Sequence, residues 1–116
     1  MKLNIIADSS CDLPEKYLKK IKLAPMTLKF KDEVVKDRVD ISPSDFYNKL
    51  KSINYSPGSA APSAGDFLQH LKKDHDNFII AISSALSSSY NNALVAKDLF
   101  LDKVNDGVVH VFDTLN

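Results

Sequence analysis

Apolar residues along this chain recur in short runs that alternate with polar, turn-forming segments. Three of the runs have the length of a strand, over residues 3–7, 77–82 and 108–112. The run at 77–82 is the most apolar stretch of the sequence, as is typical of a strand in a parallel sheet that is covered on both faces. The pattern therefore predicts three buried strands.

Helix-start signals stand between and after these strands. Each predicted start has a side chain that can cap a helix, and proline or a carboxylate follows within the first turn in three of the four. Apolar residues then recur at helical spacing. The four predicted helices begin near Asp12, Ser42, Ser63 and Ser88 and end near Lys20, Ser52, Lys73 and Lys103.

The two remaining segments are a predicted hairpin and a long loop. Residues 22–35 alternate apolar and polar positions around a charged turn, which predicts a β-hairpin. Residues 54–62 are rich in Ser, Pro and Gly, which predicts a loop longer than an ordinary connection. The whole order predicts an α/β fold, a layered domain with a mostly parallel sheet flanked by helices plus a β-hairpin.

The chain ends directly after the last predicted strand, with no helix to cover it. We therefore expect residues 1–116 to form a single, incomplete α/β domain at the front of a larger protein. An uncovered sheet edge and core face would also allow self-association of the truncated domain.

Composition narrows the class of protein. The 116 residues are 44% hydrophobic and 26% charged, with 15 basic and 15 acidic side chains, as in one soluble domain. A balanced charge argues against a nucleic-acid partner, and no apolar run is long enough to span a membrane. A lone Cys11 and the lack of a signal-peptide core predict a cytoplasmic protein.

Polar residues gather where the predicted strands end. The clusters are Asp8 to Ser10, the loop containing Ser59 and Ser63, and the serines from Ser83 to Ser89. In open α/β sheets, ligands bind outside the carboxyl ends of the strands, and helix N-termini there attract anions. A phosphate or carboxylate site is one interpretation of these clusters, and ordinary helix capping is the other.

Two other functions compete with anion binding by a carrier. Ser87 could be the nucleophile of a hydrolase or transferase, although it lacks the glycines of a G-x-S-x-G elbow, and His70, His75 and His110 lie on other elements. The helix starts could also form a phosphate- or sugar-phosphate-sensing module. We predict no catalytic residue, no metal site and no cofactor.

Five motifs in this order resemble the N-terminal part of DegV-type proteins, the fatty-acid-binding subunits of bacterial fatty acid kinase systems. They are similar to the family patterns D-S-[TS]-C-D-L-P, D-I-S-x-x-x-F-Y, T-S-Q-P-S-x-G-[DE]-F, I-S-S-x-L-S-G-T-Y-Q-S-A and V-x-D-[ST]. In this chain they fall on residues 8–14, 40–47, 59–67, 82–93 and 111–114.

The resemblance implies a DegV-like N-terminal domain that binds a long-chain fatty acid as its only ligand. It implies that the hydroxyls of Ser59 and Ser87 hold the carboxylate, with Ser9, Ala60 and Ser88 as further pocket residues. It also implies a role as a carrier, for phosphorylation by a separate kinase subunit or for lipid transport. The chain departs from the family at Ser59, where the family has threonine, and at Ser88, where it has glycine.

Overall fold

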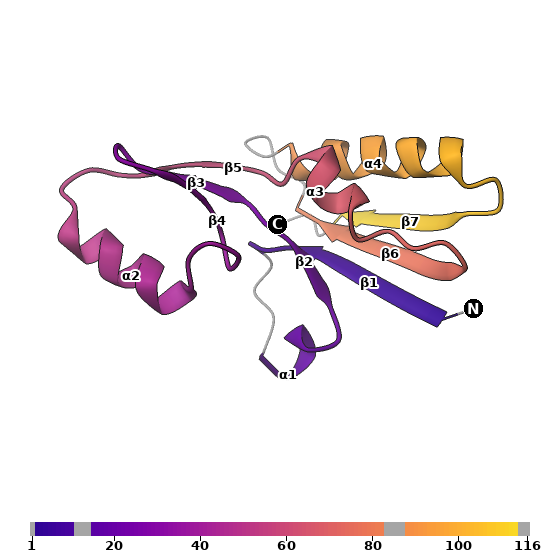
Figure 1. Ribbon diagram of the computed structural model, residues 1–116, viewed down its shortest axis with the longest axis horizontal. Helices are drawn as coiled ribbons and strands as arrows, with labels where there is room; N and C mark the ends of the chain where they lie inside the picture. Colours follow the sequence, from indigo (N-terminus) through magenta and orange to yellow (C-terminus); the bar gives the residue numbers. More distant parts are fainter. Residues whose placement is uncertain (1, 11–14, 83–87, 114–116) are drawn as a thin grey trace.

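The computed structural model describes residues 2–10, 15–82 and 88–113, which form two β-sheets and four helices (Figure 1). In chain order the elements are β1 (Lys2–Asp8), α1 (Glu15–Leu18), β2 (Lys22–Ala24), β3 (Thr27–Lys29), β4 (Val34–Lys36), α2 (Pro43–Ser52), β5 (Gly58–Ala60), α3 (Ala64–Leu68), β6 (His75–Ala81), α4 (Ser89–Lys103) and β7 (Val108–Asp113).

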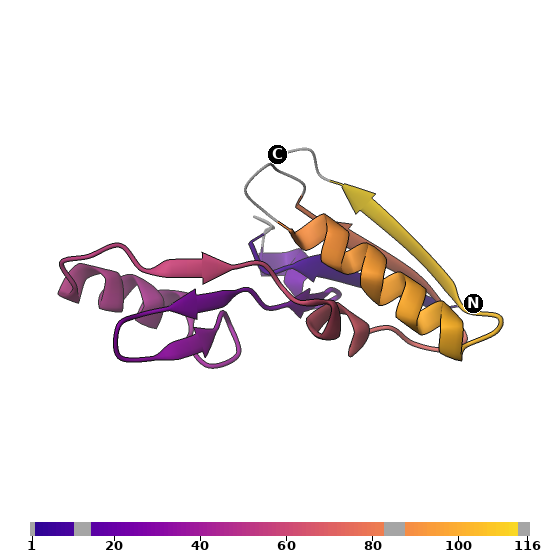
Figure 2. The same ribbon diagram turned by 90° about the horizontal axis from the view of Figure 1, so that it is seen from above.

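The larger sheet is parallel throughout and has the order β2-β1-β6-β7. Helices α3 and α4 lie over one of its faces, as Figures 1 and 2 show. This arrangement confirms the predicted α/β fold with a parallel sheet flanked by helices. It also brings the carboxyl ends of β1 and β6 to the same edge of the sheet, where ligands bind in folds of this kind.

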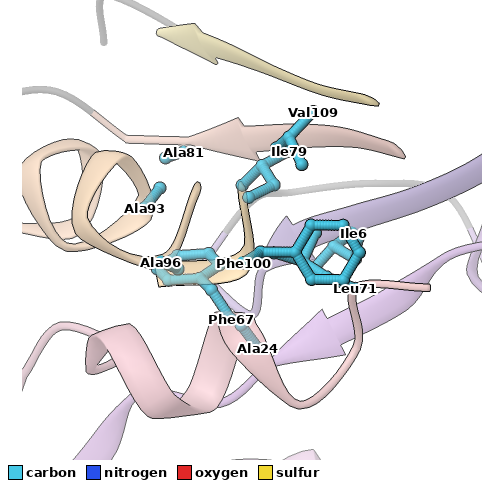
Figure 3. Packing of buried hydrophobic residues seen from close by; sticks show 10 residues of the cluster. All are labelled: Ile6, Ala24, Phe67, Leu71, Ile79, Ala81, Ala93, Ala96, Phe100 and Val109. Carbon is cyan, nitrogen blue, oxygen red and sulfur yellow. The ribbon is translucent and has the colours of Figure 1, made fainter. Parts of the chain in front are cut away.

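The core lies between this sheet and the two helices. Every second residue of β6 is buried, so that Ile79 and Ala81 face the helices while Phe78 and Ile80 face the opposite side. The small side chains on the inner face of α4 let the helix approach the strands closely. Figure 3 shows the cluster, which comprises Ile6, Ala24, Phe67, Leu71, Ile79, Ala81, Ala93, Ala96, Phe100 and Val109.

Two buried asparagines join the strands at the other end of the sheet. Asn77 is fully buried, and its Oδ1 accepts hydrogen bonds from Asn4 Nδ2 at 2.7 Å and from the Lys72 backbone N–H at 3.0 Å. Its Nδ2 donates to the carbonyl oxygens of Lys72 and Val108 at 2.9 and 3.0 Å. One amide thus connects β1, β7 and the segment before β6.

The smaller sheet is antiparallel, with the order β4-β3-β5, and extends away from the larger one (Figure 2). The predicted hairpin over residues 22–35 is therefore wrong in its first strand. Residues 22–24 form β2 of the parallel sheet, and the hairpin consists of β3 and β4. Buried Pro25 separates β2 from β3, and it lacks the N–H that a continuous ladder needs.

Two further boundaries differ from the sequence prediction. Residues 58–60 of the predicted loop form β5, because β3 offers them a partner strand. Helix α3 ends at Leu68, five residues before the predicted end at Lys73, and turns that include the positive-φ residue Asp74 follow it. The predicted start of α1 at Asp12 lies outside the described residues.

Asp66 connects the two sheets. It belongs to a capping box in which Ser63 Oγ accepts from the Asp66 N–H and Asp66 accepts from the Ser63 N–H, and it also pairs with Lys36 of β4 at 3.1 Å. Burial alone would raise the pKa of Asp66, but the bonds from Ser63 and Lys36 outweigh burial and lower it. The ionised carboxylate therefore stabilises the fold fully at pH values above 3.8, the pKa of Asp66 in the unfolded chain. This stabilisation is lost as the pH falls through the lower pKa of the folded state.

We expect Asp66→Asn to lower the free energy of unfolding by about 1 kcal/mol at neutral pH, because a capping interaction and an ion pair are lost. The difference from the wild type should shrink in acid, where Asp66 is protonated in both states. Urea denaturation at neutral and acidic pH measures both effects. Asp45→Asn is the matched control, since Asp45 occupies the same third position of α2. Equal losses in the two variants would contradict this role for Asp66.

Candidate functional site

A polar cavity of about 390 Å³ lies at the carboxyl ends of β1 and β6. It is bounded by the ends of both strands, by β5 from the smaller sheet and by the N-terminus of α4. The described residues that line it are Asp8, Ser10, Met26, Ser59, Ala60, Ala61, Ile82 and Ser88. The structure thus brings three of the sequence-predicted site residues, Ser59, Ala60 and Ser88, to one cavity.

Strand β5 supplies one wall of the cavity. Ser59 pairs with Leu28 of β3, which fixes the backbone of a segment with little strand propensity of its own. Ala60 and Ala61 follow it and add only methyl groups to the wall. The small side chains leave the Ser59 hydroxyl accessible, and Ser59 is exposed. A ligand can therefore approach both this hydroxyl and the neighbouring backbone.

Ser88 supplies part of the facing wall. It is the N-cap residue of α4, yet its side chain forms no capping hydrogen bond, and its Oγ accepts a long bond of 3.4 Å from Asn92 Nδ2. A capping bond would use the Ser88 oxygen as an acceptor, and the hydroxyl can donate its own proton to a ligand at this helix N-terminus, where anions are favoured. The backbone φ of −95° is an ordinary value for serine, so the replacement of the family glycine causes no strain at this position.

Ser87, the second predicted carboxylate donor, lies outside the described residues. Ser9 is described and buried, but it is not among the residues that line the cavity. Its Oγ donates to Asp37 Oδ2 at 2.8 Å and accepts from the Met26 N–H at 3.0 Å, so that it supports the loop behind the cavity.

Asp8 is a cavity residue that the predicted site did not include. Its side chain is 2% exposed, and its carboxylate accepts three hydrogen bonds. Oδ1 accepts from the Ser10 N–H at 2.9 Å and from Ser10 Oγ at 2.7 Å, and Oδ2 accepts from Ser89 Oγ at 2.5 Å. The period-two order of Asn4, Ile6 and Asp8 on β1, all three buried, was the sequence signal that Asp8 points inward.

None of the three histidines, all of which are described, lines this cavity. His110 pairs with Asp76 at 3.2 Å and stacks on Phe78, on the uncovered face of the sheet. Burial lowers the pKa of His70, which lies beyond the end of α3. The arrangement therefore gives no support to a hydrolase in which a histidine activates a serine of this cavity.

A second, apolar cavity of about 540 Å³ lies on the sheet face that α3 and α4 do not cover. Its lining consists of Leu3, Ile5, Phe78, Ile80, Phe112 and Asp113. Leu3 and Phe112 are 62% and 51% exposed. Ile80 of this cavity lies near the carboxyl end of β6, and Ile82 of the polar cavity directly follows that strand. Both cavities therefore have lining residues at the carboxyl end of β6.

The described part of the chain has neither a metal-binding cluster nor a membrane-spanning helix. They contain no cluster of three or more His, Cys, Asp or Glu side chains that could hold a metal ion. They also contain no helix that is long and apolar enough to cross a membrane.

The fold and the cavities define an α/β domain with a polar cavity at the carboxyl ends of parallel strands and an apolar cavity on the uncovered face of the sheet. The model of the DegV family, described as uncharacterised proteins, matches residues 2–116. The chain therefore belongs to the DegV family.

Relatives and solved structures agree with this assignment. A DegV domain-containing protein of Streptococcus gordonii is 30% identical over 122 residues, which cover 100% of this chain and 43% of the relative. A stearic acid-binding protein from Eubacterium ventriosum has a TM-score of 0.87 at 28% identity, over 96% of this chain and 41% of that one. The Streptococcus pneumoniae Fatty Acid Kinase (Fak) B3 protein, solved with linoleic acid, has a TM-score of 0.84 at 30% identity. The match covers 100% of this chain and 43% of that one. The chain spans less than half the length of these proteins.

Proposed function

We propose that this chain forms part of a binding site for a long-chain fatty acid, with the carboxylate in the polar cavity and the acyl chain along the apolar sheet face. The observation that carries this proposal is that a polar and an apolar cavity both have lining residues at the carboxyl end of β6, Ile82 and Ile80 respectively. An amphipathic ligand with one small polar end matches this arrangement. The fatty acids bound by the Eubacterium ventriosum and Streptococcus pneumoniae proteins support it.

The proposed head-group donors are the hydroxyls of Ser59 and Ser87, with Ser88 beside them. Ser59 is accessible from the cavity, and Ser88 lines it at the N-terminus of α4, where its hydroxyl can act as a donor. Hydroxyl donors to a carboxylate form charge-assisted hydrogen bonds of about 1.5–3 kcal/mol each. Ala60 belongs to the same pocket because its small side chain lets the head group reach the wall. Ser9 acts behind the pocket rather than in it.

The apolar face is the proposed surface for the acyl chain. Burial of methylene groups against Ile5, Phe78 and Ile80 would contribute about 0.8 kcal/mol per buried CH₂. An exposed apolar face of this kind is also unfavourable in water. We therefore keep the expectation that the 116-residue chain self-associates when it is produced alone.

The proposed role is that of a carrier without catalytic activity of its own. A separate, ATP-dependent kinase would phosphorylate the carboxylate that the carrier presents, as the name Fatty Acid Kinase suggests for the Streptococcus pneumoniae protein. Incubation of the loaded protein with such a kinase and ATP, followed by trapping of acyl phosphate with hydroxylamine, tests this step. If no acyl phosphate forms, the proposed carrier role is lipid transport without phosphorylation.

We expect the natural full-length protein that contains this chain to co-purify with, or take up, one long-chain fatty acid per molecule. The measurement is mass spectrometry of a solvent extract, before and after loading with a mixture of palmitate, stearate and oleate. A short-chain acid such as butyrate is the control ligand, since it has the head group without the apolar chain. The absence of any bound acyl chain after loading would contradict the proposed function.

A further inference from the structure

Two walls of the polar cavity belong to different parts of the fold. The segment from Ser59 to Ala61 starts in β5 of the smaller sheet, and Ser88 stands at the N-terminus of α4. Strand β5 pairs with β3, and neither strand belongs to the sheet that α4 covers. The strand pairings therefore do not fix the distance between these two walls, and other contacts must fix it.

Asn92 provides such a contact from α4. Its Nδ2 donates to the carbonyl oxygen of Pro62 at 2.9 Å, across 30 positions of the sequence. Pro62 is fully buried and directly follows Ala61, a residue of the cavity wall. Buried carbonyl groups are paired with donors in native structures. Because proline has no backbone N–H, the only polar backbone atom of Pro62 is an acceptor, and the Asn92 amide must turn its NH₂ group toward it.

The same amide reaches the other wall. Asn92 follows Ser88 by four residues, so the two side chains are neighbours on the surface of the helix. Nδ2 of Asn92 lies 3.4 Å from Ser88 Oγ, which acts as the acceptor. A primary amide has two N–H donors, so one side chain can serve both the Pro62 carbonyl and the Ser88 hydroxyl. Since Ser88 Oγ accepts this bond, its own proton can be directed to a ligand.

The position of Asn92 in the helix also indicates a tertiary role. Asparagine is a poor helix former, because its side chain competes for backbone hydrogen bonds. Asn91 precedes it with the same side chain, but Asn91 is exposed, whereas Asn92 is half-buried. The chain thus places two equal side chains next to each other, one directed to solvent and one that joins the walls of the cavity.

We propose, building on the proposed function, that Asn92 is a positioning residue for the head group of the fatty acid. Its amide holds the segment from Ser59 to Ala61 at a fixed distance from the N-terminus of α4. O–H···O hydrogen bonds need about 2.5–3.0 Å between the oxygens, so hydroxyls on the two walls can share one small carboxylate only if the walls keep this distance. Asn92 acts through the walls, since it is not among the residues that line the cavity.

A double-mutant cycle for palmitate binding tests this role in the natural full-length protein, with Asn92→Ala and Ser59→Ala. Each single variant should weaken binding roughly tenfold, which corresponds to one charge-assisted hydrogen bond. If Asn92 positions the wall that contains Ser59, the double variant should lose much less than the roughly hundredfold expected of independent effects. A purely structural role would lower the stability without this coupling. Isothermal titration calorimetry gives the affinities, and urea denaturation gives the stabilities.

Asn91→Ala is the matched control, because it removes the same amide from the neighbouring exposed position. It should leave palmitate affinity within about twofold of the wild type, both alone and combined with Ser59→Ala. Asn92→Leu keeps the number and branching of the side-chain heavy atoms and is more favourable in a helix than asparagine, so it removes the donor without weakening α4. It should reproduce the loss seen with Asn92→Ala, and it replaces that variant in the cycle if the alanine variant does not fold.

The results distinguish this role from the proposed function. Unchanged palmitate affinity in a folded Asn92 variant, a full hundredfold loss in the double variant, or an equal loss in Asn91→Ala would overturn the positioning role, while binding to the wild type still supported the function. Failure of both Asn92 variants to fold would also overturn it, since Asn92 would then serve the fold rather than the site. If palmitate does not bind to the wild type, the proposed function fails and the positioning role fails with it.

Discussion

The double variant Ser59→Ala, Ser87→Ala should weaken palmitate binding by the natural full-length protein on the order of a hundredfold. The two hydroxyls are the proposed donors to the carboxylate, and each charge-assisted bond is worth about 1.5–3 kcal/mol before the remaining donors and water compensate in part. A hundredfold change corresponds to about 2.7 kcal/mol. Isothermal titration calorimetry with palmitate measures the loss, and the two single variants show whether the donors act independently.

The matched control for this experiment is Ser63→Ala. Ser63 is a serine between β5 and α3 and caps that helix, but it does not line the polar cavity. It should lower the stability of the protein by about 1 kcal/mol and leave palmitate affinity near that of the wild type. An unchanged affinity in the double variant would show that the carboxylate is held elsewhere, while an equal loss in Ser63→Ala would point to damage to the fold.

A comparably large effect on stability is expected for Asn77→Ala, with a loss on the order of 3 kcal/mol in the free energy of unfolding. The substitution removes the partner of the Asn4 amide and of the Lys72 backbone N–H, in a place without access to water. Buried polar groups left without a partner cost about 1–3 kcal/mol each. Urea denaturation followed by circular dichroism gives the difference from the wild type.

Two further variants separate the polar contribution from the packing contribution. Asn77→Leu keeps the number and branching of the side-chain heavy atoms, and it should be about as destabilising as alanine because the same polar groups lose their partner. Asn54→Ala, at an exposed position of the loop before β5, should cost little. Recovery of wild-type stability in Asn77→Leu would contradict the importance of the hydrogen bonds.

The sequence predicted the elements that depend on local patterns. Helix α2 begins directly after Ser42 and ends at Ser52 as expected, because the cap, the proline at the first position and the apolar spacing all act within one segment. The strands β1, β6 and β7 were recognised from apolar runs, since both faces of a parallel sheet favour such residues. These predictions required no knowledge of distant partners.

The elements that the sequence missed depend on partners far away in the chain. Gly58, Ser59 and Ala60 have little strand propensity, and they form β5 because β3 is adjacent. Lys22 to Ala24 resemble half of a hairpin, yet they pair in parallel with Ile6 to Asp8. A period-two pattern predicts a strand, but it does not say which neighbour the strand pairs with.

In the candidate site too, the residues predicted from local motifs differ from those that depend on distant partners. Polar clusters at strand ends, together with the family motifs, predicted Ser59, Ala60 and Ser88, and the structure brings these three together. Asp8 was within one of the clusters but received no role, because its partner Ser89 is 81 positions away in the sequence. The binding roles of Ser59 and Ser87 remain predictions for the experiments above.

The position of β1 in the parallel sheet has a consequence for folding kinetics. Residues 2–7 are synthesised well before their partners in β6, residues 75–80, so β1 must wait for the intervening segment before it can pair with β6. Closing such long loops costs entropy before any contact repays it, and folds dominated by distant pairings therefore fold slowly. Until β6 is available, the apolar residues of Lys2–Asp8 lack this partner strand, and exposed segments of this kind make folding intermediates prone to aggregation.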